Sequence, residues 1–327
     1  MASANPLGII ESLGNGVDPG ALGVQKLDTG YLDLRWLKLP RAQTLATARL
    51  GEARIEYRPG RPSVAGCNLS KTDFAGSDLG ELTWESPYTL EDVKMDRIQG
   101  RHQCFRPGLV RQATFRRADL RDSHWGVSGK PGPTWDEVDF EGANLRGSTF
   151  GHPLFRGCRF GKTKLDGIDF NGSRFEDCVF QGPMRDVWFH GKGRGKGPDI
   201  QDLRNPMKNV DFTKADLQFV EFLDGADLTT CRFPERGYIR IRHPKRVFQL
   251  VRGRVASWKD KGRDEALKYV GYLVDYHFAQ EVPLYVMRPE DLSDHRNLRG
   301  VGARILQELE AVLQEQSSDS DHIPSNP

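Results

Sequence analysis

The sequence predicts a mainly β solenoid of four-sided coils, followed by a helical C-terminal region. Large apolar residues recur at every fifth position through the middle of the chain, whereas helical periodicity is confined to its end. The composition agrees, because the apolar fraction is only 37% while glycine (35 residues) and phenylalanine (17 residues) are plentiful. A narrow solenoid has little interior per residue, so this composition suits it better than a thick α/β domain.

The five-residue repeat is clearest between residues 105 and 180. A small or β-branched residue precedes most of the large apolar residues by two positions, as Ala118 precedes Leu120. In an extended segment such pairs face the same way, so both point inward, the residue between them points outward, and the other two turn a corner. Four such sides close a coil of about 20 residues, stacked about 4.8 Å from the next coil.

Residues 20 positions apart are expected to stack in columns inside the coils. The spacing predicts two such columns, which are Leu120, Phe140, Phe160 and Phe180 in one and Phe115, Trp135, Phe155 and Phe175 in the other.

Four tripeptides carry a resemblance to a known family. Ala118-Asp119-Leu120, Ala143-Asn144-Leu145, Ala215-Asp216-Leu217 and Ala226-Asp227-Leu228 resemble the A-(D/N)-L-x-x signature of pentapeptide-repeat proteins. The resemblance covers about residues 43 to 233 and implies a right-handed quadrilateral β-helix. It also implies a function, because known bacterial members bind DNA gyrase or a related type II topoisomerase. They protect it from quinolones or toxins through an acidic, DNA-like surface.

The repeat and its interruptions divide the chain into four parts. The predicted parts are an N-terminal segment with a capping strand (1–42), the β-helix (43–233), a helical C-terminal domain or cap (234–315) and a disordered tail (316–327). Insertions are expected near residues 85–104, 126–134 and 181–209, where the motif is lost. Lys130 falls on an inward position within one of them, which favours an extruded loop because an unpaired lysine is costly to bury.

The cysteines and histidines do not form a recognisable metal or catalytic motif. Cys67, Cys158, Cys178 and Cys231 occupy the small inward position, which predicts buried thiols, and Cys104 is out of phase and is expected to be exposed. The histidines are scattered, so we expect no metal site and no cofactor. No CxxC spacing, signal-peptide pattern or membrane-length apolar stretch occurs, which predicts a reducing, cytoplasmic location.

Basic residues gather after the repeat and in one glycine-rich stretch. The candidate partner- or phosphate-binding residues are Arg236, Arg240, Arg242, Lys245, Arg246, Arg252, Arg254 and Lys259 in the first group and Lys192, Arg194 and Lys196 in the second. From Asp264 onward the charge balance reverses. The basic segment therefore either contacts nucleic acid or an acidic partner, or pairs with the acidic segment inside one domain.

These observations favour a non-enzymatic protein-binding scaffold. Its most specific form is modulation or protection of DNA gyrase or another type II topoisomerase, as part of antibiotic or toxin self-resistance. The solenoid is nearly neutral on average between residues 65 and 180, whereas a DNA mimic needs an anionic stripe. The alternatives are a nucleic-acid-associated protein that uses residues 236–263 and, third, an enzyme. A homodimer through the C-terminal helices remains open.

Overall fold

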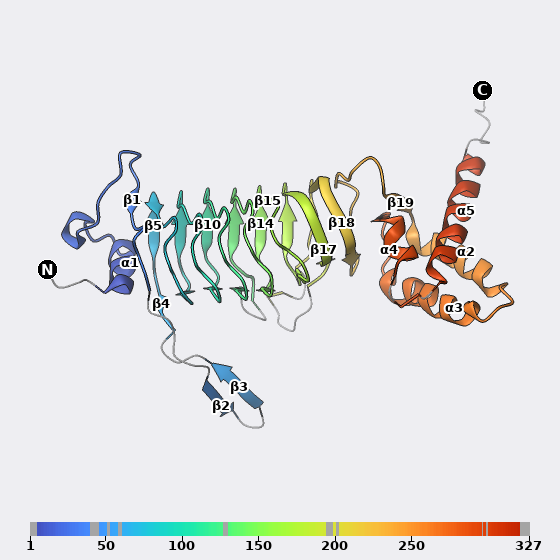
Figure 1. Cartoon of the computed structure of the whole chain (residues 1–327), viewed down its shortest axis with the longest axis horizontal. Coiled ribbons are helices and arrows are strands. Elements are labelled where there is room, and N and C mark those ends of the chain that lie inside the picture. Colours follow the sequence, from blue (N-terminus) through green and yellow to red (C-terminus); the bar gives the residue numbers. More distant parts are fainter. Residues whose placement is uncertain are drawn as a thin grey trace.

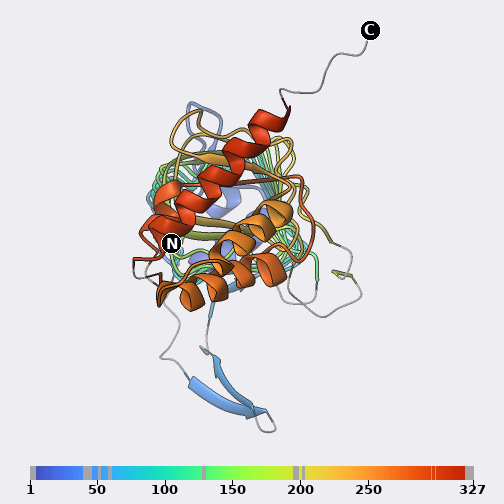
Figure 2. The ribbon, with the colours of Figure 1, turned by 90° about the vertical axis from the view of Figure 1, so that its right-hand side faces the viewer.

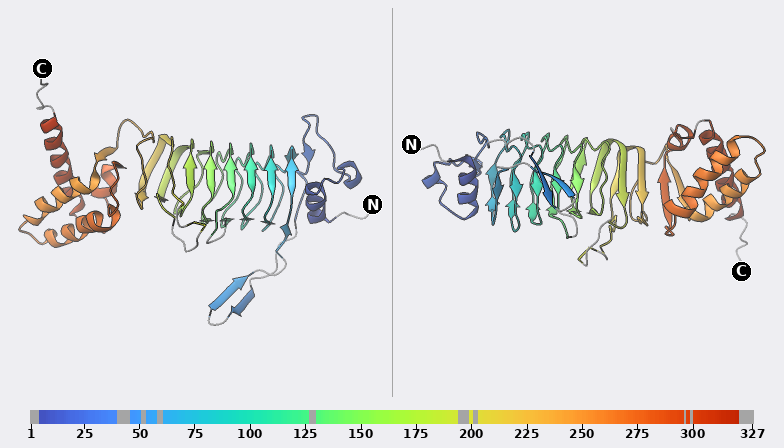
Figure 3. Two further views of the ribbon diagram at one scale, coloured as in Figure 1. Left: turned by 180° about the vertical axis from the view of Figure 1, so that it is seen from behind. Right: turned by 90° about the horizontal axis from the view of Figure 1, so that it is seen from below.

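The computed structural model describes residues 5–39, 46–50, 53–57, 61–126, 130–193, 199–200, 203–295, 297–298 and 300–320. The molecule is elongated (Figure 1). A stack of parallel β coils occupies its middle, α1 (Pro6–Gly14) lies at one end, and a helical region lies at the other (Figures 1 and 3). Viewed along the stack, the C-terminal helices lie over the end of the coils (Figure 2).

Two parallel sheets run along the stack. The larger joins β5 (Asn68–Ser70), β8 (Thr89–Glu91), β10 (Leu109–Arg111), β12 (Thr134–Asp136), β14 (Leu154–Arg156) and β16 (Arg174–Glu176). The other joins β4 (Ser63–Val64), β7 (Thr83–Trp84), β9 (Cys104–Phe105), β11 (His124–Trp125) and β13 (Thr149–Phe150).

Two further parallel ladders lie between these sheets, largely as single bridges. One passes through Lys94, Thr114, Asp139 and Arg159, and the next through Gln99, Asp119, Asn144 and Lys164. At its end the first ladder widens into β15 (Arg159–Gly161), β17 (Val179–His190) and β18 (Asp211–Leu223). Each coil thus joins four ladders, and the predicted parallel β-helix is confirmed.

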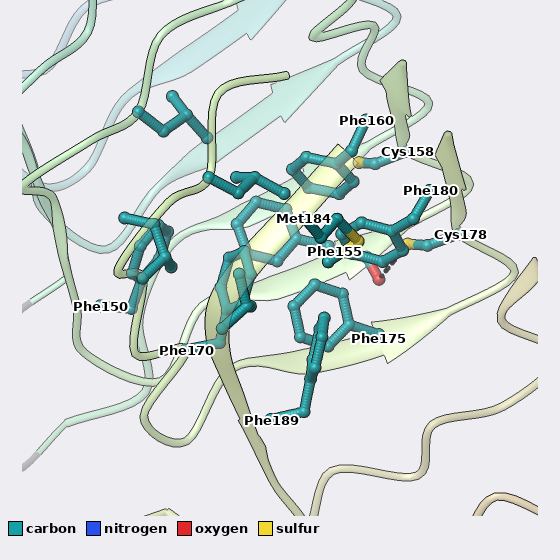
Figure 4. Packing of buried hydrophobic residues seen from close by; sticks show 14 of the residues in the cluster. Phe150, Phe155, Cys158, Phe160, Phe170, Phe175, Cys178, Phe180, Met184 and Phe189 are labelled. Atoms are coloured by element: carbon teal, nitrogen blue, oxygen red, sulfur yellow. Dashed lines mark hydrogen bonds between the residues drawn. The ribbon is translucent and has the colours of Figure 1, made fainter. Parts of the chain in front are cut away.

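Aromatic rings fill the interior in continuous stacks. The rings of Phe140 and Phe160 stack at 5.1 Å and 13°. Those of Phe160 and Phe180 stack at 4.6 Å and 5° (Figure 4). The same column continues to Phe212 and Phe233 at similar distances. Phe155 and Phe175 stack in a second column at 5.3 Å. Buried rings of this kind each contribute about 1.5–3 kcal/mol of burial free energy, with stacking added.

The predicted columns are wrong at one step. Phe115 stacks on Phe140 rather than on Trp135, and Leu120 lies in the column of Leu145 rather than of Phe140. The reason is that Val110 pairs with Trp135, 25 residues later, because residues 126–134 hold one extra set of five residues. Lys130 is exposed in this loop, as predicted, while residues 127–129 lie outside the described residues.

The expected insertion at residues 85–104 is instead a regular coil. Leu90 pairs with Leu69 and with Val110, and Phe105 pairs with Trp84. These offsets show that the coil holds one residue more than its neighbours, and that this residue lies between Trp84 and Leu90. Because of it, the five-residue repeat continues in a different register of the sequence, which hides the motif. The insertion expected at 181–209 is shorter than predicted, because residues 179–190 form β17 and the chain leaves the coil only between His190 and Lys208.

The N-terminal part also differs from the prediction. The capping strand predicted within residues 1–42 is present as β1 (Leu32–Asp33), and it pairs in parallel with β6 (Thr72–Asp73). The solenoid therefore begins before residue 43. Residues expected to form its first coil instead form an antiparallel hairpin, β2 (Ala46–Leu50) with β3 (Ala53–Tyr57), that projects from the stack (Figure 3). Upstream, α1 and the short η1 (Gly20–Leu22) are ordered, and α1 contacts β4 and β5.

The C-terminal region contains helices, and also one strand pair that the sequence did not predict. Its elements are β19 (Ile239–Arg242), α2 (Pro244–Ala256), α3 (Gly262–Tyr272), the π-helical turn η2 (Leu273–His277), β20 (Leu284–Met287), α4 (Pro289–Ser293) and α5 (Gly302–Ser320). β19 pairs antiparallel with β20, and β20 also contacts β18 of the solenoid. Helix α5 extends to residue 320, so residues 316–320 are helical rather than disordered, while 321–327 lie outside the described residues.

The cysteine predictions are corrected at two positions, Cys231 and Cys104. Cys67, Cys158 and Cys178 are buried as predicted, Cys231 is half-buried, and all five thiols are free. The Cys158 thiol donates to Trp135 O at 3.3 Å, and burial raises the pKa of Cys158. Cys104, expected to be exposed, is buried beside the charged side chains of Arg106 and Arg61, and burial raises its pKa.

Candidate interaction faces and a pocket at the end of the solenoid

One face of the solenoid is rich in bases. On each face of the coil the bridge residues point outward. The residues two positions before and after each bridge residue lie at or beside the corners of the same face, and many of them have positive φ. Beside the Gln99–Asp119–Asn144–Lys164 ladder, between residues 92 and 218, the bases are Arg97, Arg101, Arg117, Arg121, Arg146, Lys162, Lys164, Arg185 and Lys214, and the acids are Asp119, Asp166 and Asp216. We call this surface the basic face.

Part of this charge is neutralised within the face. Asp119 pairs with Arg101 at 3.0 Å and with Arg121 at 2.6 Å, and Arg146 pairs with Asp166. Arg97, Arg117, Lys162, Lys164 and Lys214 are exposed and, in the part of the chain that the structure describes, form no ion pair. The basic face therefore keeps an unneutralised row of cations.

The preceding face of the coil carries the opposite charge. Beside the Lys94–Thr114–Asp139–Arg159 ladder and over the same residues, the acids are Asp92, Asp96, Glu137, Asp139, Glu141, Asp177 and Asp211, and the bases are Lys94, Arg116 and Arg159. We call this the acidic face. Arg116 pairs with Asp139 at 2.9 Å, but the other carboxylates outnumber the remaining bases. The near-neutral average of the sequence therefore hides two faces of opposite sign.

The basic residues predicted after the repeat are spread over β19, α2 and the following loop. Arg252 lies 3.4 Å from Asp275, and Arg254 pairs with Glu308 at 3.6 Å and Glu315 at 2.5 Å. Arg240 donates to Pro234 O at 2.7 Å, and Lys245 donates to Ala279 O at 3.4 Å.

Half of this predicted site is therefore bound inside its own domain. The remaining predicted residues are exposed and form no ion pair within the described ranges; they are Arg236, Arg242, Arg246 and Lys259. In the glycine-rich stretch, Lys192 is half-buried in a bridge with Arg204, and Arg194 and Lys196 lie outside the described residues.

A pocket that the sequence did not predict lies where the last coil meets the C-terminal region. Its volume is about 680 Å³, within the range of small-ligand sites. β18 contributes Phe219, Val220 and Glu221, and α3 and η2 contribute Glu265, Lys268, Tyr269, Tyr272, Leu273 and His277. Tyr285, Met287, Asp291, His295, Asn297 and Leu298 complete the wall. No local sequence motif could have identified it, because its residues are separated by up to about eighty positions.

A buried histidine joins three successive coils near this end of the solenoid. His190 is 1% exposed, and its Nε2 lies 2.9 Å from Asp169 Oδ1 while its Nδ1 lies 2.6 Å from Asp224 Oδ2. Burial lowers the pKa of His190, but the hydrogen bonds and charges of Asp169 and Asp224 outweigh it, and the net shift is upward. The two carboxylates therefore stabilise the imidazolium form of His190 relative to that of an exposed histidine.

This triad predicts a pH-dependent part of the stability. Because the folded pKa of His190 is raised, its contribution is fully present below the unfolded value of about 6.5 and is lost as pH rises through the folded pKa. We expect the difference in Tm between the parent and His190→Gln to shrink from pH 6 to pH 9. Thermal melts by circular dichroism at fixed ionic strength measure it. A constant difference across this range would contradict the assignment.

The five-residue repeat and the stacked parallel coils together define a parallel β-helix protein whose sequence repeats every five residues. No protein-family model and no curated protein matches the chain. Among solved structures it is similar to QnrB1, described as a plasmid-mediated fluoroquinolone resistance protein. The identity is 13% and the TM-score 0.20, over 50% of this chain and 91% of that chain.

A second solved structure that it resembles is HetL. That protein is described as a pentapeptide repeat protein involved in heterocyst differentiation regulation, from the cyanobacterium Nostoc sp. strain PCC 7120. The identity is 11% and the TM-score 0.21, over 53% of this chain and 83% of that chain. Since these scores are low, the fold assignment rests on the strand registers of the chain itself.

The described residues contain no candidate membrane span and no candidate metal site. No helix among them is both long and apolar enough to cross a bilayer. They also contain no group of three or more His, Cys, Asp or Glu side chains placed to hold a metal ion.

Proposed function

We propose that this chain is a non-enzymatic protein-binding scaffold whose four ladders form the walls of a quadrilateral coil capped by the helical region 234–315. The observation that carries the proposal is the pair of oppositely charged faces on one closely packed stack. Rings stacked in the core hold the coils in register, so the outward charges are presented at fixed spacing. Fixed, complementary charge favours a specific partner and fast association.

The specific form of this proposal is modulation or protection of DNA gyrase or another type II topoisomerase. The resemblance to pentapeptide-repeat proteins suggests this target, and the acidic face supports it. A groove that binds DNA accepts a row of negative charges in place of phosphates. Glu137, Asp139 and Glu141 lie together on this face, and they are the residues we expect to face the enzyme.

A supercoiling assay with and without a quinolone tests the topoisomerase form. We expect the parent chain to inhibit gyrase or to protect it at micromolar concentration. Glu137→Lys/Glu141→Lys should raise the required concentration at least about tenfold, since charge complementarity is reversed. The matched control is Lys162→Glu/Lys164→Glu on the basic face, which should act like the parent. If the parent has no effect at micromolar concentration, the topoisomerase form is wrong; equal loss in both variants would remove the acidic face from it.

The second candidate is a nucleic-acid-associated protein that uses the segment 236–263. The exposed Arg236, Arg242, Arg246 and Lys259 favour it. Binding to duplex DNA should then weaken steeply with salt and should fall on Arg242→Glu/Arg246→Glu. No observation in the described residues favours an enzymatic function. Light scattering would test whether the chain forms a homodimer through the C-terminal helices.

A further inference from the structure

The pocket between the last coil and the C-terminal region is walled by three tyrosine rings. Tyr269 and Tyr272 come from α3 and Tyr285 from β20. Each is braced by a further ring: Tyr269 by His295 at 5.2 Å, Tyr272 by Tyr276 at 6.0 Å, and Tyr285 by Phe278 at 5.0 Å. Braced rings hold their orientation, which prepares the pocket for a ligand that binds to aromatic faces.

Carboxylates line the same pocket. Burial raises the pKa of Asp291 to about 6, and it also raises the pKa of Glu221. Burial outweighs the charge of Arg288 at Asp291, and at Glu221 it outweighs the hydrogen bond from Trp188 and the charge of His190. Arg288 is also paired with Asp216 at 3.0 Å and with Glu290 at 3.5 Å. Glu265 also lines the pocket, and the lining base, Lys268, is exposed. The pocket is therefore acidic, because Glu221, Glu265 and Asp291 outnumber the lysine in its lining.

A buried histidine contributes a polar atom that has no partner. The His277 side chain is 3% exposed, and its Nε2 forms no hydrogen bond within the described part of the chain. Burial lowers the pKa of His277 to about 4, so the ring is neutral at physiological pH and adds no positive charge to the pocket. An unpaired polar atom in a buried wall is costly, and a bound ligand or water would satisfy it.

We propose that this pocket binds an organic cation of the ammonium type. Aromatic faces attract such a cation, and partly desolvated carboxylates that outnumber the lysine of the pocket attract it further. An anionic ligand would face Glu221, Glu265 and Asp291, and a purely apolar ligand would bury these carboxylates further without offering them a charged partner. The proposal does not depend on the function proposed for the charged faces, because the pocket lies beyond them at the end of the solenoid.

Titration of the full chain with choline, monitored by calorimetry, tests the proposal. Its neutral isostere 3,3-dimethylbutan-1-ol serves as the matched ligand, and we expect choline to bind at least about tenfold more tightly because only choline carries the charge. Tyr272→Ala and Glu221→Gln should each weaken choline binding about fivefold or more. Both positions are partly exposed, so these variants are expected to fold.

Control variants carry the same substitutions far from the pocket. Tyr31→Ala, near the N-terminal end of the solenoid, and Glu310→Gln, exposed on α5, should bind choline within about twofold of the parent. A peptide with one trimethyl-lysine is titrated in parallel. Tighter binding of this peptide than of choline would indicate a cation carried by a protein, and weaker binding would indicate a free small molecule. Absence of choline binding, equal binding of the neutral isostere, or unchanged binding in Tyr272→Ala and Glu221→Gln would each overturn the proposal.

Discussion

Phe160→Ala is expected to lower the free energy of unfolding by about 3–5 kcal/mol. The Phe160 ring is 1% exposed and lies between the stacked rings of Phe140 and Phe180. Removing it leaves a cavity that the neighbours cannot fill, because backbone pairing on both sides holds their coils in place. Both the lost burial and the cavity then destabilise the fold. Urea denaturation followed by circular dichroism measures the change.

The adjacent residue provides the control for this substitution. Arg159 is exposed and points outward from the same strand, so Arg159→Ala should change the stability by no more than about 0.5 kcal/mol. Phe160→Leu should fall between the two, since it leaves a smaller cavity. If Phe160→Ala unfolds at the urea concentration of the parent, the column of rings does not carry the stability assigned to it.

The inward side chains could be predicted because the five-residue spacing is a local property of the chain. Each large residue and the small residue two positions before it share one strand, and the side-chain alternation of a strand fixes where both point. Phe140, Phe160 and Phe180 therefore fell into one column without any knowledge of the rest of the fold.

Stacking between coils could be predicted only where the coil length stayed constant. The five extra residues in 126–134 return the chain to the same sequence phase, so counting alone placed Phe115 on Trp135, one side away from its true partner Phe140. The extra residue before Leu90 had the opposite effect: it broke the phase although the coil continues. At the N-terminus, alternating residues of 46–57 fit a coil and a hairpin equally well, and the structure has the hairpin.

The charged faces and the pocket depend on the same long-range registers. Whether Lys164 lies beside Asn144 or elsewhere is decided by the number of residues in the intervening coil, so the net charge of a face is not visible in the sequence. The basic segment 236–263 was visible as a charge cluster, but the pairing of Arg254 with Glu308 and Glu315 on α5 required the helices to be placed. For the pocket, no short-range pattern links Glu221 with Tyr272 and Asp291.

In one coil the small and the large inward residues have exchanged places, at Ile98 and Gly100, and this exchange suggests a test. In most coils a small residue accompanies a large one, as Ala143 accompanies Leu145, but at the same place in an earlier coil Ile98 accompanies Gly100. A Cβ built on Gly100 would meet Ile98 Cδ1 at 3.1 Å and Leu120 Cδ2 at 3.5 Å. The isoleucine thus occupies the space that a leucine at position 100 would use.

The same exchange can be introduced at residues 143 and 145 by the substitutions Ala143→Ile and Leu145→Gly. Leu145→Gly should cost about 3 kcal/mol or more, because a buried side chain is lost and glycine frees the unfolded chain. Ala143→Ile alone should cost about 1–3 kcal/mol through overpacking. The double variant should be more stable than the sum of the two losses predicts, by about 0.5–3 kcal/mol, because the isoleucine then fills the space left by the leucine. A double-mutant cycle from urea denaturation measures this coupling, with Lys164→Leu as an outward control that adds independently. Additive losses within about 0.5 kcal/mol would mean that the two positions do not share one space, and the volume-exchange account of Ile98 and Gly100 would fail.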